Sequence, residues 1–146
     1  MEKTTYEEYL EKHNNMVYRN VGVSMLPLLK QGRDIFTIEK KTEERCKKYD
    51  VVLYRRPPSS YVLHRIIKVN PDDYTILGDN CINKEYGIKD EDIIGVMISF
   101  KRKGKDHKVT EIGYKLYSRI WYYIYPVRMI LKKIKLKIKH LVKPSK

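Results

Sequence analysis

The sequence has only two cysteines, Cys46 and Cys81, which lie 35 positions apart and form no pattern with metal-ligand spacing. They could form one disulfide, but nothing in the pattern requires it, and a reduced intracellular chain is the better expectation. We therefore expect no metal and no other cofactor. Phenylalanine is also scarce, with 2 residues against 13 tyrosines. This balance favours β-strands whose side chains are partly exposed to water.

Long apolar runs are missing as well. Residues 1–15 are polar and charged, and they lack the apolar run of about 7–15 residues that a signal peptide needs. No uncharged stretch reaches the length of about 18 residues that spans a bilayer, and the longest apolar run, Ile120–Val127, ends at Arg128. We expect neither a signal nor a spanning anchor, and a protein that is cytoplasmic or bound peripherally to a membrane.

Charge is abundant but uneven. Of 31 Lys/Arg and 18 Asp/Glu residues, residues 1–100 hold 16 of each kind, so this part is neutral and residues 101–146 carry the whole net charge of +13. Such a basic segment seeks an anionic surface, either lipid headgroups or nucleic acid. Nucleic acid is not expected, because the neutral part offers no base-reading motif.

The pattern predicts a mainly β protein. A helix is expected over Thr4–Asn14, with Thr4 and Glu7 as a capping box. Turn residues then separate six strand-like runs: Met16–Gly22, Ile35–Glu39, Val51–Tyr54, Tyr61–Val69, Tyr74–Leu77 and Ile93–Lys101. We therefore predict an N-terminal helix in residues 1–15, a small, strongly bent antiparallel β domain over 16–103 and a basic, aromatic helical tail over 104–146.

The tail is expected to begin after a charged hinge, Lys101–Lys108, and to be kinked or restarted at Pro126. Its apolar residues recur at steps of three and four, with lysines between them, which is typical of an amphipathic helix. Three interpretations stay open: docking on its own domain, a short coiled coil, or contact with an anionic membrane through residues 112–143. Aromatic residues beside the lysines favour the membrane.

Ser24 is a candidate nucleophile, because Gly22 and Pro27 place it on a constrained turn after a predicted strand. An isolated serine in such a turn is more often a cap or a buried hydroxyl. Its candidate base is His64, which lies in an otherwise apolar strand and would be a buried core histidine if it had no such role. Asp79, on the turn that follows Leu77, is the candidate acid for orienting His64, although the same residue suits an ordinary turn.

Five segments, taken in order over roughly residues 17–101, resemble the family that joins type I signal peptidases to LexA-type self-cleaving repressors. They are Gly22-x-Ser24-Met25-x-Pro27-x-Leu29, Tyr49–Tyr54, Val62–Ile67, Gly78–Asn80 and Ile93–Met97. Histidine followed by Arg65-Ile66-Ile67 is similar to the endoplasmic-reticulum, archaeal and sporulation-type signal peptidases, whereas most bacterial members have lysine there. Lys68 is a fallback base.

The resemblance implies the corresponding fold and a serine endopeptidase that cleaves a signal or leader peptide. Ser24 would attack the peptide carbonyl, His64 would take its proton, and the Ser24–Met25 turn would stabilise the oxyanion. Asp79 or Glu85 would support His64. Many relatives have a hydroxyl where this chain has Gly22. The alternatives are a non-catalytic binding module of the same fold, whose tail binds membrane or nucleic acid, and an isolated self-cleaving repressor half.

Overall fold

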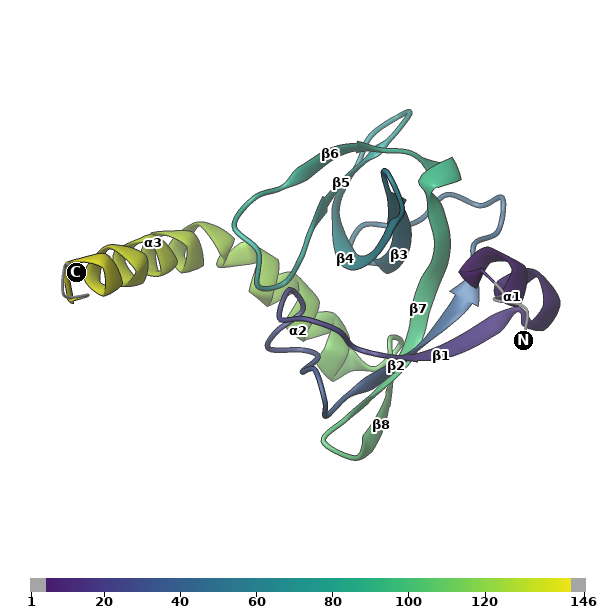
Figure 1. Cartoon of the computed structure of the whole chain (residues 1–146), viewed down its shortest axis with the longest axis horizontal. Coiled ribbons are helices and arrows are strands. Elements are labelled where there is room, and N and C mark those ends of the chain that lie inside the picture. The colour runs from purple at the N-terminus through teal and green to yellow at the C-terminus, as the bar shows by residue number, and fades with distance from the viewer. Residues whose placement is uncertain (1–4, 143–146) are drawn as a thin grey trace.

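The computed structural model describes residues 5–142 and consists of a mainly antiparallel β body with a short helix before it and two helices after it (Figure 1). The helices are α1 (Tyr6–His13), α2 (Ile112–Tyr123) and α3 (Tyr125–Val142), with a 3₁₀ turn at Asp90–Asp92. The strands are β1 (Asn15–Arg19), β2 (Ile35–Lys40), β3 (Val51–Arg56), β4 (Ser60–Val69), β5 (Tyr74–Leu77), β6 (Glu85–Ile88), β7 (Ile93–Arg102) and β8 (Lys105–Lys108). The predicted fold class, a small β domain with helical ends, is confirmed at this level.

The strands pair in the order β1-β2-β7-β3-β4-β5-β6, and β8 pairs with β7. Every pair is antiparallel, and bulges or irregularities shift the register in the β2–β7, β3–β7, β4–β5 and β5–β6 pairs. Bulges bend and twist strands, so they curl the sheet around its core. Two apolar clusters fill that core: Leu53 belongs to one, and Val52 and Tyr54 belong to the other. Strand β3 is therefore buried on both faces, and it lies at the centre of the body.

Strand β6 was not among the predicted strands, and two other local predictions need correction. Helix α1 is capped by Thr5, whose side chain accepts a hydrogen bond from the Glu8 N–H while Glu8 bonds back to Thr5; the predicted cap Thr4 lies outside the described residues. The predicted hinge over 101–108 is wrong, because Lys103 and Gly104 adopt positive φ and join β7 to β8 in a tight hairpin. The sheet thus continues to Lys108, beyond the predicted limit at residue 103.

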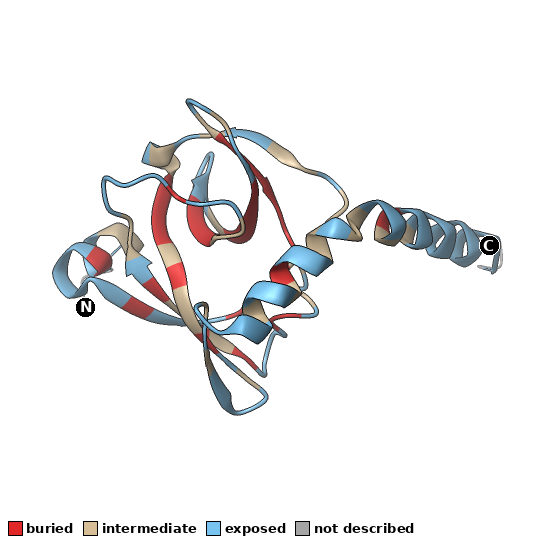
Figure 2. Cartoon of the chain, turned by 180° about the vertical axis from the view of Figure 1, so that it is seen from behind, coloured by how far each residue is buried: buried red, intermediate tan, exposed pale blue. Residues whose placement is uncertain are grey.

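The predicted restart of the tail helix at Pro126 is confirmed. Helix α2 ends at Tyr123 and α3 begins at Tyr125, so Pro126 lies in the first turn of α3, where its missing N–H costs no helical hydrogen bond. Helix α2 packs along the body, whereas α3 projects from it and is exposed along most of its length (Figures 1 and 2). None of the helices within residues 5–142 is both long and apolar enough to cross a membrane.

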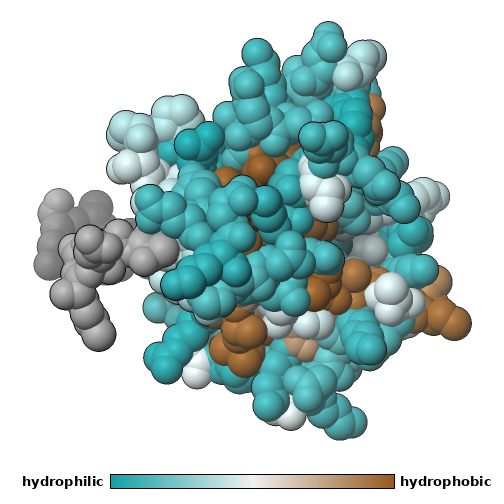
Figure 3. Space-filling model, turned by 90° about the vertical axis from the view of Figure 1, so that its right-hand side faces the viewer, coloured by the Kyte–Doolittle hydropathy of each residue, from teal (hydrophilic) through white to brown (hydrophobic). Residues whose placement is uncertain are grey.

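The opposite end of the molecule carries α1. Seen from that side, the surface is mostly hydrophilic, and its apolar side chains form separate patches rather than one continuous area (Figure 3). Leu10 turns inward from α1 into the core, which fixes the helix on the sheet.

Candidate active site

Ser24 lies in the loop between β1 and β2, on a turn held down by the buried side chains of Met25 and Leu29. Gly22 adopts a φ of +79°, a left-handed conformation that glycine tolerates best. The Ser24 side chain is partly exposed, and within residues 5–142 its hydroxyl has no hydrogen-bond partner. The turn therefore exposes the Ser24 hydroxyl without engaging it in a hydrogen bond.

Asn80 joins the Ser24 turn to the turn after β5. Its backbone N–H donates to the Ser24 carbonyl at 2.8 Å, and its side-chain amide donates to the Val23 carbonyl at 3.0 Å. Two segments more than 50 residues apart in sequence are thus held side by side. The Gly78–Asn80 turn, which the sequence singled out, fixes the backbone at Ser24.

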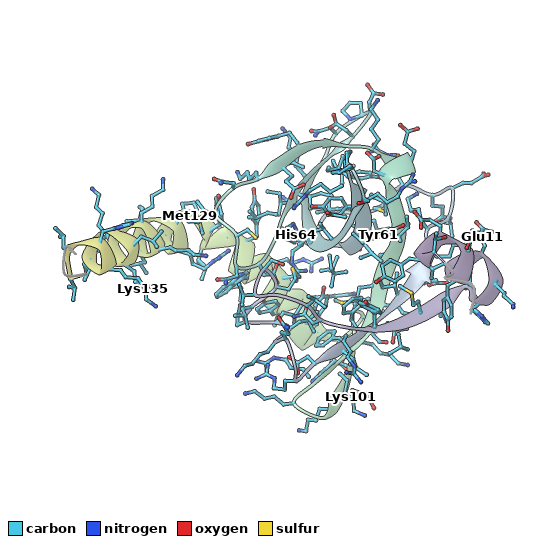
Figure 4. The ribbon with its side chains drawn as sticks, in the orientation of Figure 1. Glu11, Tyr61, His64, Lys101, Met129 and Lys135 are labelled. Carbon is cyan, nitrogen blue, oxygen red and sulfur yellow. The ribbon has the colours of Figure 1, made fainter. Side chains whose placement is uncertain are left out.

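His64 is buried on β4, within the body of the protein (Figure 4). Its Nδ1 lies 3.2 Å from the Tyr54 hydroxyl and 3.7 Å from Glu85 Oε1. Its Nε2 faces the other way and lies 3.9 Å from Cys81 Sγ. Tyr54 is the diagonal neighbour of His64 across the β3–β4 ladder, because Val52 lies directly opposite His64 and strand side chains alternate.

The pKa of His64 is lowered to about 4, chiefly by burial and in smaller part by the cationic Arg56, against the negative charges of Glu85 and Asp79. The imidazole is consequently neutral at pH 7, with one nitrogen free to accept a proton. A neutral imidazole in a buried site is the protonation state that a general base requires.

Gly78 makes room for this imidazole. A Cβ at residue 78 would lie 2.8 Å from His64 Nε2 and 2.6 Å from Cys81 Sγ, which is closer than such atoms approach one another. Any larger residue would push the ring or the thiol out of place. Glycine at the first position of the Gly78–Asn80 turn is therefore required by the packing of His64 and Cys81.

Ser24 and His64 line the same cavity, which has a volume of about 850 Å³. Arg56, Cys81, Glu85 and Lys132 contribute to its wall as well. The structure therefore brings together two of the three predicted catalytic residues. The side chains of Ser24 and His64 do not hydrogen-bond to each other. The polar side-chain group in contact with His64 Nε2, among residues 5–142, is the Cys81 thiol.

Asp79 has a different position from the one predicted. Its carboxylate accepts two hydrogen bonds from the buried Arg65, at 2.8 and 2.9 Å, and one from the Tyr117 hydroxyl at 2.8 Å. No hydrogen bond joins it to His64 among residues 5–142. A buried guanidinium needs a paired carboxylate, and Arg65 takes this one. Glu85, the alternative acid, is the carboxylate near His64 Nδ1, and it also pairs with Arg56.

Lys68 does not reach the cavity: it is exposed at the far end of β4. Among the residues near His64 or in the cavity wall, Tyr54, Cys81 and Lys132 were not predicted as site residues. Lys132 comes from α3, where its ammonium group donates to the Asn80 carbonyl. Helical spacing showed that α3 is amphipathic, but nothing local could show that one of its lysines would reach the turn beside Ser24.

The C-terminal helices clamp the same turn. Trp121 Nε1 and Arg128 Nη1 donate to the Asp79 carbonyl at 2.8 and 3.1 Å, and the Tyr125 hydroxyl donates to the Ile82 carbonyl at 2.5 Å. Docking of the tail on its own domain is thus observed for α2 and the start of α3.

Within the described part of the chain, no group of three or more His, Cys, Asp or Glu side chains is arranged to hold a metal ion. Comparisons with family models, curated proteins and solved structures find no match to this chain. The chemistry of the site therefore has to be inferred from its own geometry.

Proposed function

We propose that this protein is a serine endopeptidase of the signal-peptidase type, with Ser24 as nucleophile and His64 as general base, and that it cleaves a signal or leader peptide. The observation that carries the proposal is the cavity shared by a free serine hydroxyl and a buried, neutral imidazole. The five sequence segments that resemble this family support it, and the antiparallel β body with its bulged strands is compatible with it.

The proposed reaction begins when substrate binding brings the Ser24 hydroxyl to His64 Nε2. Catalytic hydrogen bonds are often absent before substrate binds and tighten in the complex. Ser24 Oγ then attacks the scissile carbonyl carbon while its proton passes to Nε2. His64 returns that proton to the leaving amine, and a water molecule, deprotonated by the same imidazole, hydrolyses the acyl-enzyme and regenerates Ser24.

Tyr54 is the proposed positioning residue. For Nε2 to accept a proton, Nδ1 must carry the hydrogen and donate it, and the Tyr54 oxygen is 3.2 Å away. Tyr54 can in turn direct its own proton toward Glu85. Burial, and after it the negative charge of Glu85, raises the pKa of the Tyr54 hydroxyl. This arrangement gives Tyr54 and Glu85 the part that Asp79 was predicted to play.

The oxyanion would be held by backbone amides of the Ser24 turn. The N–H groups of Ser24 and Met25 donate no hydrogen bond within residues 5–142, and Ser24 itself lines the cavity. Preorganised amide donors of this kind typically stabilise the tetrahedral intermediate by a few kcal/mol.

The experiment uses the full chain, a library of synthetic peptides with alanine one and three positions before a potential cut, and mass spectrometry of the products. Ser24→Ala and His64→Ala should each lower cleavage by about 10³-fold or more while the thermal unfolding transition remains cooperative. Ser59→Ala, at an exposed serine in the β3–β4 turn, is the matched control and should cleave normally. A fluorophosphonate should label Ser24.

Cys81→Ala separates this proposal from a cysteine-based reaction, since Cys81 Sγ is close to His64 Nε2. Burial raises the pKa of this thiol, which disfavours the thiolate that nucleophilic attack needs. Cleavage should survive in Cys81→Ala. Cleavage that survives Ser24→Ala but not Cys81→Ala would overturn the assignment, and cleavage in no form of the protein would favour a non-catalytic binding module.

A further inference from the structure

Both C-terminal helices carry an apolar stripe that faces away from the body. On α2 the stripe consists of Ile112, Leu116, Ile120 and Tyr123, which share one helix face. All four are exposed, at 54–85%. The face toward the body is different and holds Tyr114, Tyr117, the buried Ser118 and Trp121. The stripe is therefore not part of the core.

Helix α3 carries an apolar stripe of its own. Its apolar side chains lie within one arc of the helix, at 100° per residue, and are 49–85% exposed: Val127, Ile130, Leu131, Ile134, Ile138 and Leu141. Met129, which is buried, and Lys132, which bonds to Asn80, lie on the opposite side of the helix. The outward face of α3 is correspondingly exposed in Figure 2, while Lys135 extends from the projecting part in Figure 4.

The charges around the two stripes have one sign. From Ile112 to Val142 the sequence has no Asp or Glu and eight Lys or Arg residues: Lys115, Arg119, Arg128, Lys132, Lys133, Lys135, Lys137 and Lys139. Lys133 and Lys137 border the α3 stripe on one side and Lys135 borders it on the other, at 100° per residue. A second copy of the same helix would bring like charge to this border, whereas an anionic lipid surface brings the opposite charge.

We propose that α2 and α3 lie on the surface of an anionic membrane, with their two apolar stripes in the headgroup region and the bordering lysines on lipid phosphates. The exposed Tyr123 fits this depth, because tyrosine rings favour the membrane–water interface. Lys132 and the cavity it lines lie on the opposite side of α3 from the stripe, so lipid can bury the stripe without covering that contact. This binding does not depend on the proposed peptidase activity.

The test is flotation of the full chain with vesicles of phosphatidylcholine alone or of about 7:3 phosphatidylcholine to phosphatidylglycerol. Binding is expected to the anionic vesicles and should weaken between about 0.1 and 0.5 M salt. Ile134→Gln with Ile138→Gln should weaken it by about tenfold or more, because apolar area is lost. Leu136→Gln is the matched control: Leu136 is 45% exposed on the opposite face of α3 and its change should have less than about a twofold effect.

Equal binding by the double Gln variant and the Leu136→Gln control would overturn the proposal. So would dimers in lipid-free sedimentation equilibrium that the double variant dissociates, with no vesicle binding, since a second copy would then cover the stripe. Double-stranded oligonucleotide that binds at the same salt, with no binding to vesicles, would overturn it as well. Ser24→Ala should float with the vesicles like the unaltered chain. Membrane binding is thus tested independently of the peptidase assignment.

Discussion

Arg65 and Asp79 form a buried, bidentate ion pair in which each side chain is only 2% exposed. The pair joins β4 to the turn that carries Asn80. Its arginine, Arg65, directly follows His64 in the sequence. Removing one partner leaves the other charge buried and unpaired, which typically costs 3–5 kcal/mol. We expect Asp79→Ala to lower the free energy of unfolding by about that amount, measured by urea denaturation.

A double-mutant cycle with Arg65→Met gives the control. The double variant removes both charges and should lose less stability than the two single variants added together. Strictly additive losses would contradict a direct interaction. In Asp79→Ala, the rate of cleavage should fall in proportion to the fraction of protein that remains folded. In Ser24→Ala, by contrast, cleavage should be lost although the protein is folded.

The second prediction concerns stability in acid. The folded pKa of His64, about 4, lies below the ordinary value of 6.5 because of burial, so the unfolded chain binds this proton more readily. The stabilising effect is complete above pH 6.5 and is lost as the pH falls toward 4. At pH 4.5 the loss from this group is about 2.5 kcal/mol.

Urea unfolding at pH 7 and pH 4.5 measures that loss, and His64→Gln is the control because glutamine does not titrate. The change in unfolding free energy between the two pH values should be smaller in His64→Gln by about 2.5 kcal/mol. An equal change in both proteins would mean that His64 titrates at its usual pKa and is not buried as described.

The third prediction follows from the contact between Tyr54 and His64. Without the Tyr54 hydroxyl, Nδ1–H loses its acceptor, and the population with a free Nε2 falls. Tyr54→Phe should lower kcat by about 10–100-fold with little change in KM. The decisive readout is the ¹⁵N spectrum of His64, which should report hydrogen on Nδ1 in the unaltered chain and a shift toward hydrogen on Nε2 in Tyr54→Phe. An unchanged tautomer would limit Tyr54 to packing.

The segments of the site that depend on local patterns could be predicted, and those that depend on register could not. The constrained turn at Ser24 and the apolar strand around His64 are visible within a few residues. The contact of His64 with Tyr54 requires the pairing of β3 with β4, in which Val52 faces His64. Short strands do not specify such a register from their sequence alone, because several offsets keep the same alternation.

The partner of Asp79 could not be predicted for a similar reason. An acid on a turn can face either of two successive residues of a neighbouring strand, here His64 or Arg65. In the structure Asp79 pairs with Arg65, and α2 adds to this pairing: the Tyr117 hydroxyl also donates to Asp79, and the Tyr117 ring lies 5.7 Å from the Arg65 guanidinium. Strand β8 was missed because its residues are polar and charged, and a hairpin edge needs little apolar area once its turn is formed.

The last prediction compares two glycines. Gly78→Ala would place a Cβ 2.8 Å from His64 Nε2, and we expect it to lower the free energy of unfolding by about 1–3 kcal/mol and to abolish cleavage by displacing the ring. Gly113→Ala is the control, because nothing lies within 4 Å of its added Cβ in α2, and it should be neutral or stabilise by up to about 1 kcal/mol. If Gly78→Ala cleaves normally, the His64 imidazole does not need its present position for catalysis. The assignment of His64 as base would then have to be withdrawn.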